Sequence, residues 1–127
     1  MNSNAIPVVL TADPDPCQRE ILEALFAKAG WKSVGARTAC ETALKAMAYH
    51  PDLIVLETTF PDGNGPDLCA RLRRDPATAG IPIMFRSELN EEFDQIAAFA
   101  SGADDYTSKT LGTAQIHARA LNLIRRR

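Results

Sequence analysis

The sequence predicts an α/β fold in which a doubly wound, five-stranded parallel sheet is flanked by five helices. Short apolar runs of strand length alternate with segments of helical periodicity throughout the 127 residues, and only short connections separate them. Alternation of this kind implies right-handed β-α-β crossovers, which produce a parallel sheet with helices on both faces.

Each element is predicted from the spacing of its apolar residues. Gly30 ends the first helix in a backbone conformation that glycine adopts easily, and Pro51 excludes His50 from the second. Phe26, Phe85 and Phe99 have the spacing of core residues. The predicted strands are Val8–Ala12, Trp31–Ala36, Leu53–Leu56, Ile81–Phe85 and Asp105–Tyr106; the predicted helices are the segment before Gly30, Ala39–Tyr49, Asp67–Arg74, Glu91–Ala100 and Thr113–Arg126, with a turn at Pro61–Gly65.

Length, charge and cysteine content limit the classes of protein. With 46% apolar and 24% charged residues, residues 1–127 have the composition of one globular domain. The net charge of -2 gives no positive field for direct nucleic-acid binding, and the basic cluster is confined to Arg125–Arg127. No apolar run approaches the roughly 20 residues that span a bilayer. Three widely spaced cysteines form no disulfide framework or zinc motif, which favours a cytoplasmic protein: Cys17, Cys40 and Cys69.

Four polar side chains stand at or just beyond the ends of predicted strands: Asp13, Glu57, Ser87 and Lys109. The carboxyl ends of parallel strands meet at one edge of the sheet, so these side chains should converge on one crevice. Two acids, a hydroxyl and a lysine suit a divalent cation and a phosphoryl group. A structural interpretation stays open, in which Asp13 caps a helix and Glu57 forms an ion pair with Lys109.

The segment Pro51–Gly65 reads PDLIVLETTFPDGNG. It resembles the PDLILLDxxMPxxDG signature of response-regulator receiver domains, which have a flavodoxin-like fold. Further similarity lies in the Asp15-Pro16 pair, in IPIM at Ile81–Met84, and in GADDYTSK at Gly102–Lys109, which looks like GADDYLTKP. The resemblance covers essentially the whole chain. It implies a signalling domain rather than an enzyme, in which Mg²⁺-dependent transfer moves phosphate from a phosphohistidine kinase to an aspartate.

The metal-binding part of the family pattern is altered. Asp13 matches the first acid of the family's metal-binding pair, but Pro14 stands where the second belongs and offers no side-chain oxygen. The backbone carbonyl of Thr59 would be directed at the metal. The resemblance therefore implies that Mg²⁺ binding is weakened or rearranged.

The phosphoacceptor position is altered as well, whereas the residues that respond to phosphate are retained. Glu57 occupies the acceptor position, and its additional methylene moves the carboxylate by about 1.5 Å, enough to spoil in-line attack. Glu88 adds a negative charge beside the phosphate opening. Ser87 matches the switch hydroxyl, Tyr106 the switch aromatic residue and Lys109 the phosphate-contacting lysine. The leading hypothesis is a pseudo-receiver of a two-component phosphorelay, in which Glu57 contacts Lys109 and maintains an active-like state.

Four alternatives remain. A still-competent receiver would hold Mg²⁺ through Asp13 or Asp15 and accept phosphate at Glu57. Asp13-Pro14-Asp15 also mimics the DxD motif of haloacid-dehalogenase-like phosphatases, although the hydroxyl expected soon afterwards is missing. A flavin- or nucleotide-binding domain has the same fold, but no glycine-rich phosphate loop is present. An engineered replacement would account for Glu57 alone.

The partners implied by the resemblance are a histidine kinase or an output module. The chain ends in LNLIRRR, a helical segment with no stop signal, which suits fusion to such a module in a longer parent chain. Apolar residues among the charges of the fourth and fifth helices would also suit a homodimer. The cognate kinase, the output and the pathway are not encoded in recognisable residues.

Overall fold

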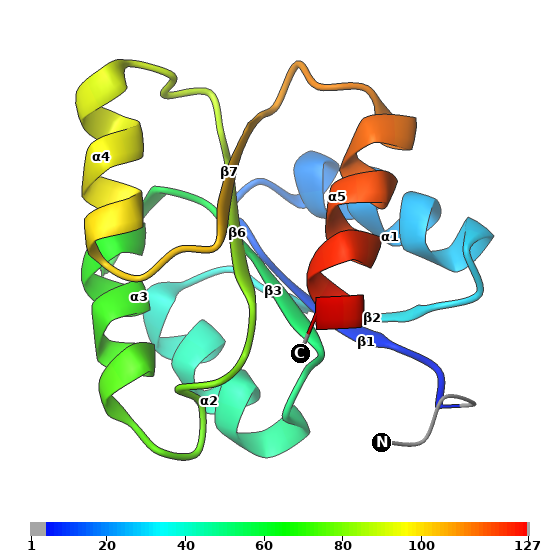
Figure 1. Ribbon diagram of the computed structural model, residues 1–127, viewed down its shortest axis with the longest axis horizontal. Helices are drawn as coiled ribbons and strands as arrows, with labels where there is room; N and C mark the ends of the chain where they lie inside the picture. The colour runs from blue at the N-terminus through cyan, green and yellow to red at the C-terminus, as the bar shows by residue number, and fades with distance from the viewer. Residues whose placement is uncertain (1–4, 127) are drawn as a thin grey trace.

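The computed structural model describes residues 5–126 and confirms the predicted fold class (Figure 1). Five parallel strands form one sheet in the order β2-β1-β3-β6-β7. From β1 the chain first adds β2 on one side of the sheet, and it then adds β3, β6 and β7 in succession on the other side of β1. The carboxyl ends of β1 and β3 therefore form the switch point at which doubly wound sheets place their sites.

The elements follow one another as the sequence predicts, apart from a small added hairpin. The strands of the main sheet are β1 (Val8–Ala12), β2 (Lys32–Ala36), β3 (Leu53–Leu56), β6 (Ile83–Ser87) and β7 (Asp105–Ser108). The helices are α1 (Pro16–Lys28), α2 (Ala39–Tyr49), α3 (Gly65–Arg74), α4 (Glu92–Ala100) and α5 (Thr113–Arg126). The hairpin consists of β4 (Thr59–Phe60) and β5 (Gly63–Asn64), paired antiparallel.

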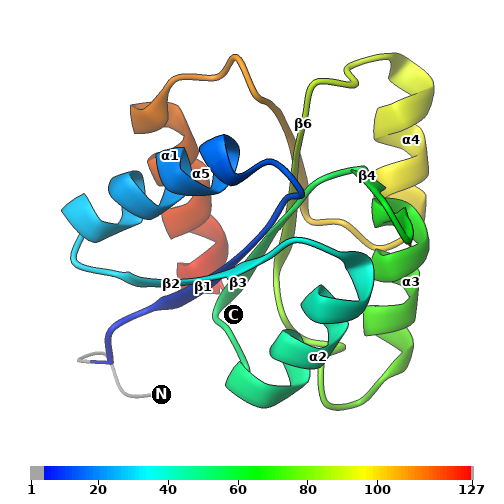
Figure 2. The same ribbon diagram turned by 180° about the vertical axis from the view of Figure 1, so that it is seen from behind.

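Helices cover both faces of the sheet (Figures 1 and 2). Helices α1 and α5 lie on one face, where Phe26 and Ile116 pack with Met84 in one apolar cluster. Helices α2, α3 and α4 lie on the other, where Leu68 packs with Phe85 in a second cluster. Strands buried between two helical layers are largely apolar on both sides, as β3 is throughout.

Strand β6 is displaced from the predicted Ile81–Phe85 to Ile83–Ser87. The proline at position 82 has no N–H to donate to the ladder, and the N–H of Ile81 is used by the carbonyl of Thr78 at 3.1 Å. At the other end, the pairing with β7 continues through Arg86 and Ser87. This extension holds the Ser87 hydroxyl at the edge of the sheet where Glu57 follows β3.

The prediction that Phe99 packs in the core is wrong, because its side chain is 48% exposed. Helix α4 buries only the small residue Ala98, so the neighbouring position on the helix, about 100° away, faces outward. Phe99 instead joins an exposed set that we call the α4 apolar surface: Leu89, Phe93, Ile96 and Phe99.

The predicted turn Pro61–Gly65 comprises the tip of the β4–β5 hairpin, strand β5 and the first residue of α3, and it caps two helices. The Asp62 carboxylate accepts hydrogen bonds from the N–H groups of Ala39 at 2.8 Å and Cys40 at 3.0 Å, at the start of α2. The Asn64 side chain accepts from the N–H of Asp67 at 2.9 Å, which starts α3 at Gly65. These caps fix the segment that follows Glu57.

Helix α5 carries the basic cluster at its carboxyl end. Arg125 and Arg126 occupy the last turn, where positive charge is favoured by the helix dipole. Arg127, the third member of the cluster, lies outside the described residues. No helix within residues 5–126 combines the length and the apolar character needed to cross a membrane.

Candidate functional site

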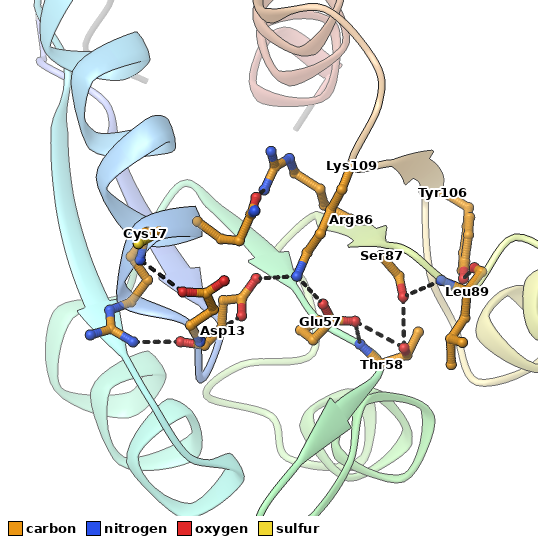
Figure 3. A network of polar contacts seen from close by, with 12 residues as sticks. Asp13, Cys17, Glu57, Thr58, Arg86, Ser87, Leu89, Tyr106 and Lys109 are labelled. Atoms are coloured by element: carbon orange, nitrogen blue, oxygen red, sulfur yellow. Dashed lines mark hydrogen bonds and ion pairs between the residues drawn. The ribbon is translucent and has the colours of Figure 1, made fainter.

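The carboxyl ends of β1, β3, β6 and β7 bring the polar side chains together at one edge of the sheet (Figure 3). The Nζ atom of Lys109 lies 2.8 Å from Oδ2 of Asp13 and 2.5 Å from Oε2 of Glu57. None of these three side chains is more than 10% exposed. One ammonium group thus bridges two carboxylates in a largely buried cluster. The ion pair between Glu57 and Lys109, which the sequence left as an open interpretation, is formed.

Ser87 is connected to Glu57 through Thr58. Oε1 of Glu57 accepts hydrogen bonds from the Thr58 N–H at 2.6 Å and the Thr58 hydroxyl at 2.9 Å. The Thr58 and Ser87 hydroxyl oxygens are 2.8 Å apart. Because the single Thr58 hydroxyl proton points to Glu57, Ser87 must donate to Thr58. Oγ of Ser87 then accepts from the Leu89 N–H at 3.1 Å, so the hydrogen bonds run in one direction toward the carboxylate.

Tyr106 fixes the same loop from the other side. Its ring is buried and stacks on Phe85, with ring centroids 5.8 Å apart. Burial raises the pKa of the Tyr106 hydroxyl, which therefore stays protonated and donates to the Leu89 carbonyl. The two backbone groups of Leu89 are tied to Ser87 and Tyr106, so the loop between β6 and α4 is joined to Glu57 by an unbroken set of hydrogen bonds (Figure 3).

The charges in the cluster stabilise one another. Burial is the largest influence on the pKa of Glu57 and acts to raise it, but hydrogen bonds from Lys109 and Thr58 outweigh it, so the pKa lies below its ordinary value of 4.5. Burial acts to lower the pKa of Lys109, but Asp13 and Glu57 outweigh it, so this pKa lies above 10.5. Both groups are charged at neutral pH.

Replacing Glu57 with glutamine should remove an acid-sensitive part of the stability. A carboxyl group whose pKa is lowered by folding stabilises the protein above its unfolded pKa, and this stabilisation is lost as pH falls through the folded value. Urea unfolding of the wild type and Glu57→Gln should therefore differ by about 1–3 kcal/mol at neutral pH. The difference should shrink as pH falls below about 4.5. Glu20→Gln, at an exposed residue of α1, is the control and should change stability by less than about 1 kcal/mol at every pH. Parallel pH profiles for the wild type and Glu57→Gln would contradict the expectation.

The side chains, as arranged, do not fit a Mg²⁺ ion. Oδ1 of Asp13 accepts from the N–H of Asp15 at 2.9 Å, and the other three carboxylate oxygens of Asp13 and Glu57 are engaged by Lys109 and Thr58. Mg²⁺ needs free carboxylate oxygens in near-ideal octahedral geometry. Among residues 5–126, no group of three His, Cys, Asp or Glu side chains is placed to hold a metal.

Three other residues singled out in the sequence border the cluster. Pro14, Thr59 and Glu88 line an open pocket together with Asp13 and Glu57. Glu88 is exposed and adds a negative charge to this pocket, whereas the side chain of Pro14 has no oxygen to offer a ligand. Asp15, the second acid of the DxD-like segment, accepts from the Cys17 N–H at 2.9 Å and caps α1.

Sequence reasoning missed two residues of the cluster, Thr58 and Arg86. Arg86 is 4% exposed, and its Nη1 donates to the Gln18 side chain at 2.9 Å. Its Nε is the one buried side-chain nitrogen or oxygen without a hydrogen-bond partner in the described part of the chain. Burial lowers the pKa of Arg86, and the charges of Asp13 and Glu57 oppose this shift. A charged residue directly after an apolar strand segment was a visible signal for Arg86; Thr58 gave none.

Comparison with known proteins places this chain in a family. The family model of the response regulator receiver domain matches residues 9–121. The chain is 35% identical over 121 residues to the DNA-binding dual master transcriptional regulator RpaA of Synechocystis sp., covering 95% of the chain and 50% of that protein. It is 35% identical over 118 residues to the KDP operon transcriptional regulatory protein KdpE of Escherichia coli, covering 93% and 51%. The chain therefore spans about half the length of these curated relatives.

Solved structures agree with the family match. The crystal structure of a two-component response regulator from Clostridium difficile superposes with a TM-score of 0.88 at 29% identity, covering 94% of this chain and 97% of that one. The family match begins at the second residue of β1, covers the other four strands of the sheet completely and includes Asp13, Glu57 and Lys109. The chain belongs to the response regulator receiver domains of two-component signal transduction.

Proposed function

We propose that this domain is a pseudo-receiver, which signals through protein–protein contacts without phosphorylation of Glu57. The 2.5 Å ion pair between Lys109 Nζ and Glu57 Oε2 carries the proposal. Family resemblance assigns Glu57 to the phosphoacceptor position and Lys109 to the phosphate contact. The Glu57 carboxylate therefore binds the lysine that a phosphoryl group would otherwise contact. A fixed negative charge at this place substitutes for the charge that modification would add.

The hydrogen bonds that leave Glu57 support an active-like state. Through Thr58 the carboxylate is connected to Ser87, the residue that matches the family's switch hydroxyl. Tyr106, which matches the switch aromatic residue, is buried and bonded to the same loop at Leu89. The charge at Glu57 is thus connected to the start of α4, the element that would present the signal to a partner.

The mouth of the pocket disfavours an anionic phosphoryl donor. Asp13, Asp15 and Glu88 line it together with Glu57, and the pocket lining contains no lysine or arginine. Negative side chains around a concave site repel a negative ligand and slow its approach. The still-competent receiver is the alternative that remains within the family.

Titration with Mg²⁺ and beryllofluoride, an acyl-phosphate mimic, tests the proposal. Amide NMR signals of Ser87, Tyr106 and Lys109 should not shift up to millimolar Mg²⁺, because the carboxylate oxygens that would hold the metal are engaged. Saturable shifts in the wild type would overturn the pseudo-receiver and favour the still-competent receiver.

The matched positive control is the double variant Pro14→Asp, Glu57→Asp. It restores both acids of the family pattern and shortens the side chain at position 57, so that the carboxylate withdraws from Lys109. Beryllofluoride with Mg²⁺ should shift the same three amides in this variant. If the amide signals shift in the control variant but not in the wild type, the residues at positions 14 and 57 are the reason that the wild type does not bind the phosphate mimic.

We further propose that the domain acts in the cytoplasm on a histidine kinase or an output module, which could be fused in a longer parent chain. The curated relatives are about twice as long and are described as transcriptional regulators, which supports an attached module. The net charge of -2 disfavours direct contact of this domain with nucleic acid. The α4 apolar surface supports contact with such a module or with a second copy of the domain.

A further inference from the structure

Arg86 lies where the sheet should be apolar. Side chains alternate along a strand, so Arg86 projects from β6 on the same side as Met84, into the layer between the sheet and helices α1 and α5. Its side chain is almost completely buried and its Nε has no hydrogen-bond partner. A buried cation of this kind costs several kcal/mol unless nearby negative charge compensates it.

The carboxylate cluster supplies such a charge. Asp13 and Glu57 carry two negative charges, and Lys109, which bridges them, carries only one positive charge. The cluster without Arg86 is therefore left with one uncompensated negative charge in a buried environment. Arg86 directly precedes Ser87, the last residue of β6, and the charges of Asp13 and Glu57 act on its guanidinium group. Its positive charge brings the sum to zero.

We propose that Arg86 is a built-in counter-ion, which with Lys109 neutralises Asp13 and Glu57 and so takes the charge-balancing place of a divalent cation. Gln18, in the first turn of α1, positions the guanidinium by accepting from Nη1 at 2.9 Å. This inference deepens the pseudo-receiver proposal, because it explains how the site is stable without metal. Arg86 is a positioning residue, since it acts on the cluster through its charge.

A double-mutant cycle between Arg86→Met and Glu57→Gln tests the counter-ion. In EDTA, Arg86→Met should lower the melting temperature of the wild type by about 5 °C or more. In the Glu57→Gln background, only Asp13 and Lys109 remain to balance each other, so the same replacement should lower it by less than half as much. Arg86→Lys keeps the positive charge and should recover at least half of the loss.

Arg119→Met is the control for net charge, because Arg119 is exposed and pairs with Asp105 away from the cluster. Arg119→Met should change the melting temperature by the same amount in the wild-type and Glu57→Gln backgrounds. If Arg86→Met lowers the melting temperature equally in both backgrounds, or raises it in both, the counter-ion proposal is wrong. The effect of Arg86 on stability would then come from its burial alone.

Mg²⁺ provides the second arm of the experiment. Millimolar Mg²⁺ should raise the melting temperature of Arg86→Met while leaving that of the wild type unchanged, because only the variant has an uncompensated negative charge. The carboxylate oxygens stay engaged by Lys109 and Thr58 in this variant, so the ion would act through its water shell rather than as a directly coordinated metal. If Arg86→Met also ignores Mg²⁺, the claim that Arg86 takes the place of a cation fails. The beryllofluoride response of the wild type is scored separately, so failure of the pseudo-receiver and failure of the counter-ion are distinguishable.

Discussion

Lys109→Met is expected to destabilise the domain by about 3–5 kcal/mol at neutral pH, because removing one partner of a buried ion pair leaves charge without compensation. Here the loss is shared by two carboxylates, Asp13 at 2.8 Å and Glu57 at 2.5 Å from the ammonium nitrogen. The measurement is urea unfolding followed by circular dichroism. Lys45→Met, the same replacement at a more exposed lysine paired with Glu41 at 3.6 Å, should cost less than about 1 kcal/mol.

The pH dependence of Lys109→Met separates lost charge from lost packing. Without Lys109, burial should raise the pKa of the Glu57 carboxyl group above its unfolded value, so the folded state binds more protons than the unfolded state. Stability of the variant should then increase as pH falls from 7 toward about 5, whereas the wild type should show no such increase. If both Lys→Met variants behave alike at all pH values, the bridging ammonium does not hold the cluster together.

The order and type of the main elements could be predicted because the spacing of apolar residues and the positions of glycine and proline agree with the final fold. Strand β3 is apolar throughout, and α2 begins and ends where it was predicted. Boundaries failed where hydrogen bonding rather than hydrophobicity decides, as at β6, which begins after Pro82. The prediction that Phe99 is a core residue failed because periodicity identifies the apolar side of a helix but does not show whether a neighbouring element covers that side.

The site could be predicted as a set of strand-end residues but not as a network. Topology alone brings Asp13, Glu57 and Lys109 to one edge. The choice between an open metal site and a closed ion pair depends on distances of a few tenths of an ångström, and these follow from side-chain packing. Thr58 illustrates the limit, since its hydroxyl connects Glu57 to Ser87 only because the backbone after β3 turns toward β6.

The backbone after β3 turns so closely that a methyl group at Gly65 has no space. A Cβ atom there would lie 2.3 Å from the Glu57 carbonyl oxygen, 2.7 Å from Cε2 of Phe85 and 3.1 Å from Cα of Thr58. Two of these neighbours are backbone atoms, and the third belongs to a fully buried ring. Gly65→Ala must therefore displace the turn, and we expect a loss of about 3 kcal/mol in unfolding free energy.

Displacement of this turn should also break the hydrogen-bond chain, since Gly65 donates its N–H to the Thr58 carbonyl at 2.8 Å. In Gly65→Ala, the amide NMR signals of Ser87 and Leu89 should shift although both residues are distant in sequence. Gly80→Ala is the matched control: no atom lies within 4 Å of the added methyl group, so stability should change by less than about 1 kcal/mol. A Gly65→Ala variant as stable as Gly80→Ala, with unchanged Ser87 and Leu89 signals, would mean that the turn yields without moving the carboxylate. Glu57 would then be held by Lys109 and Thr58 alone.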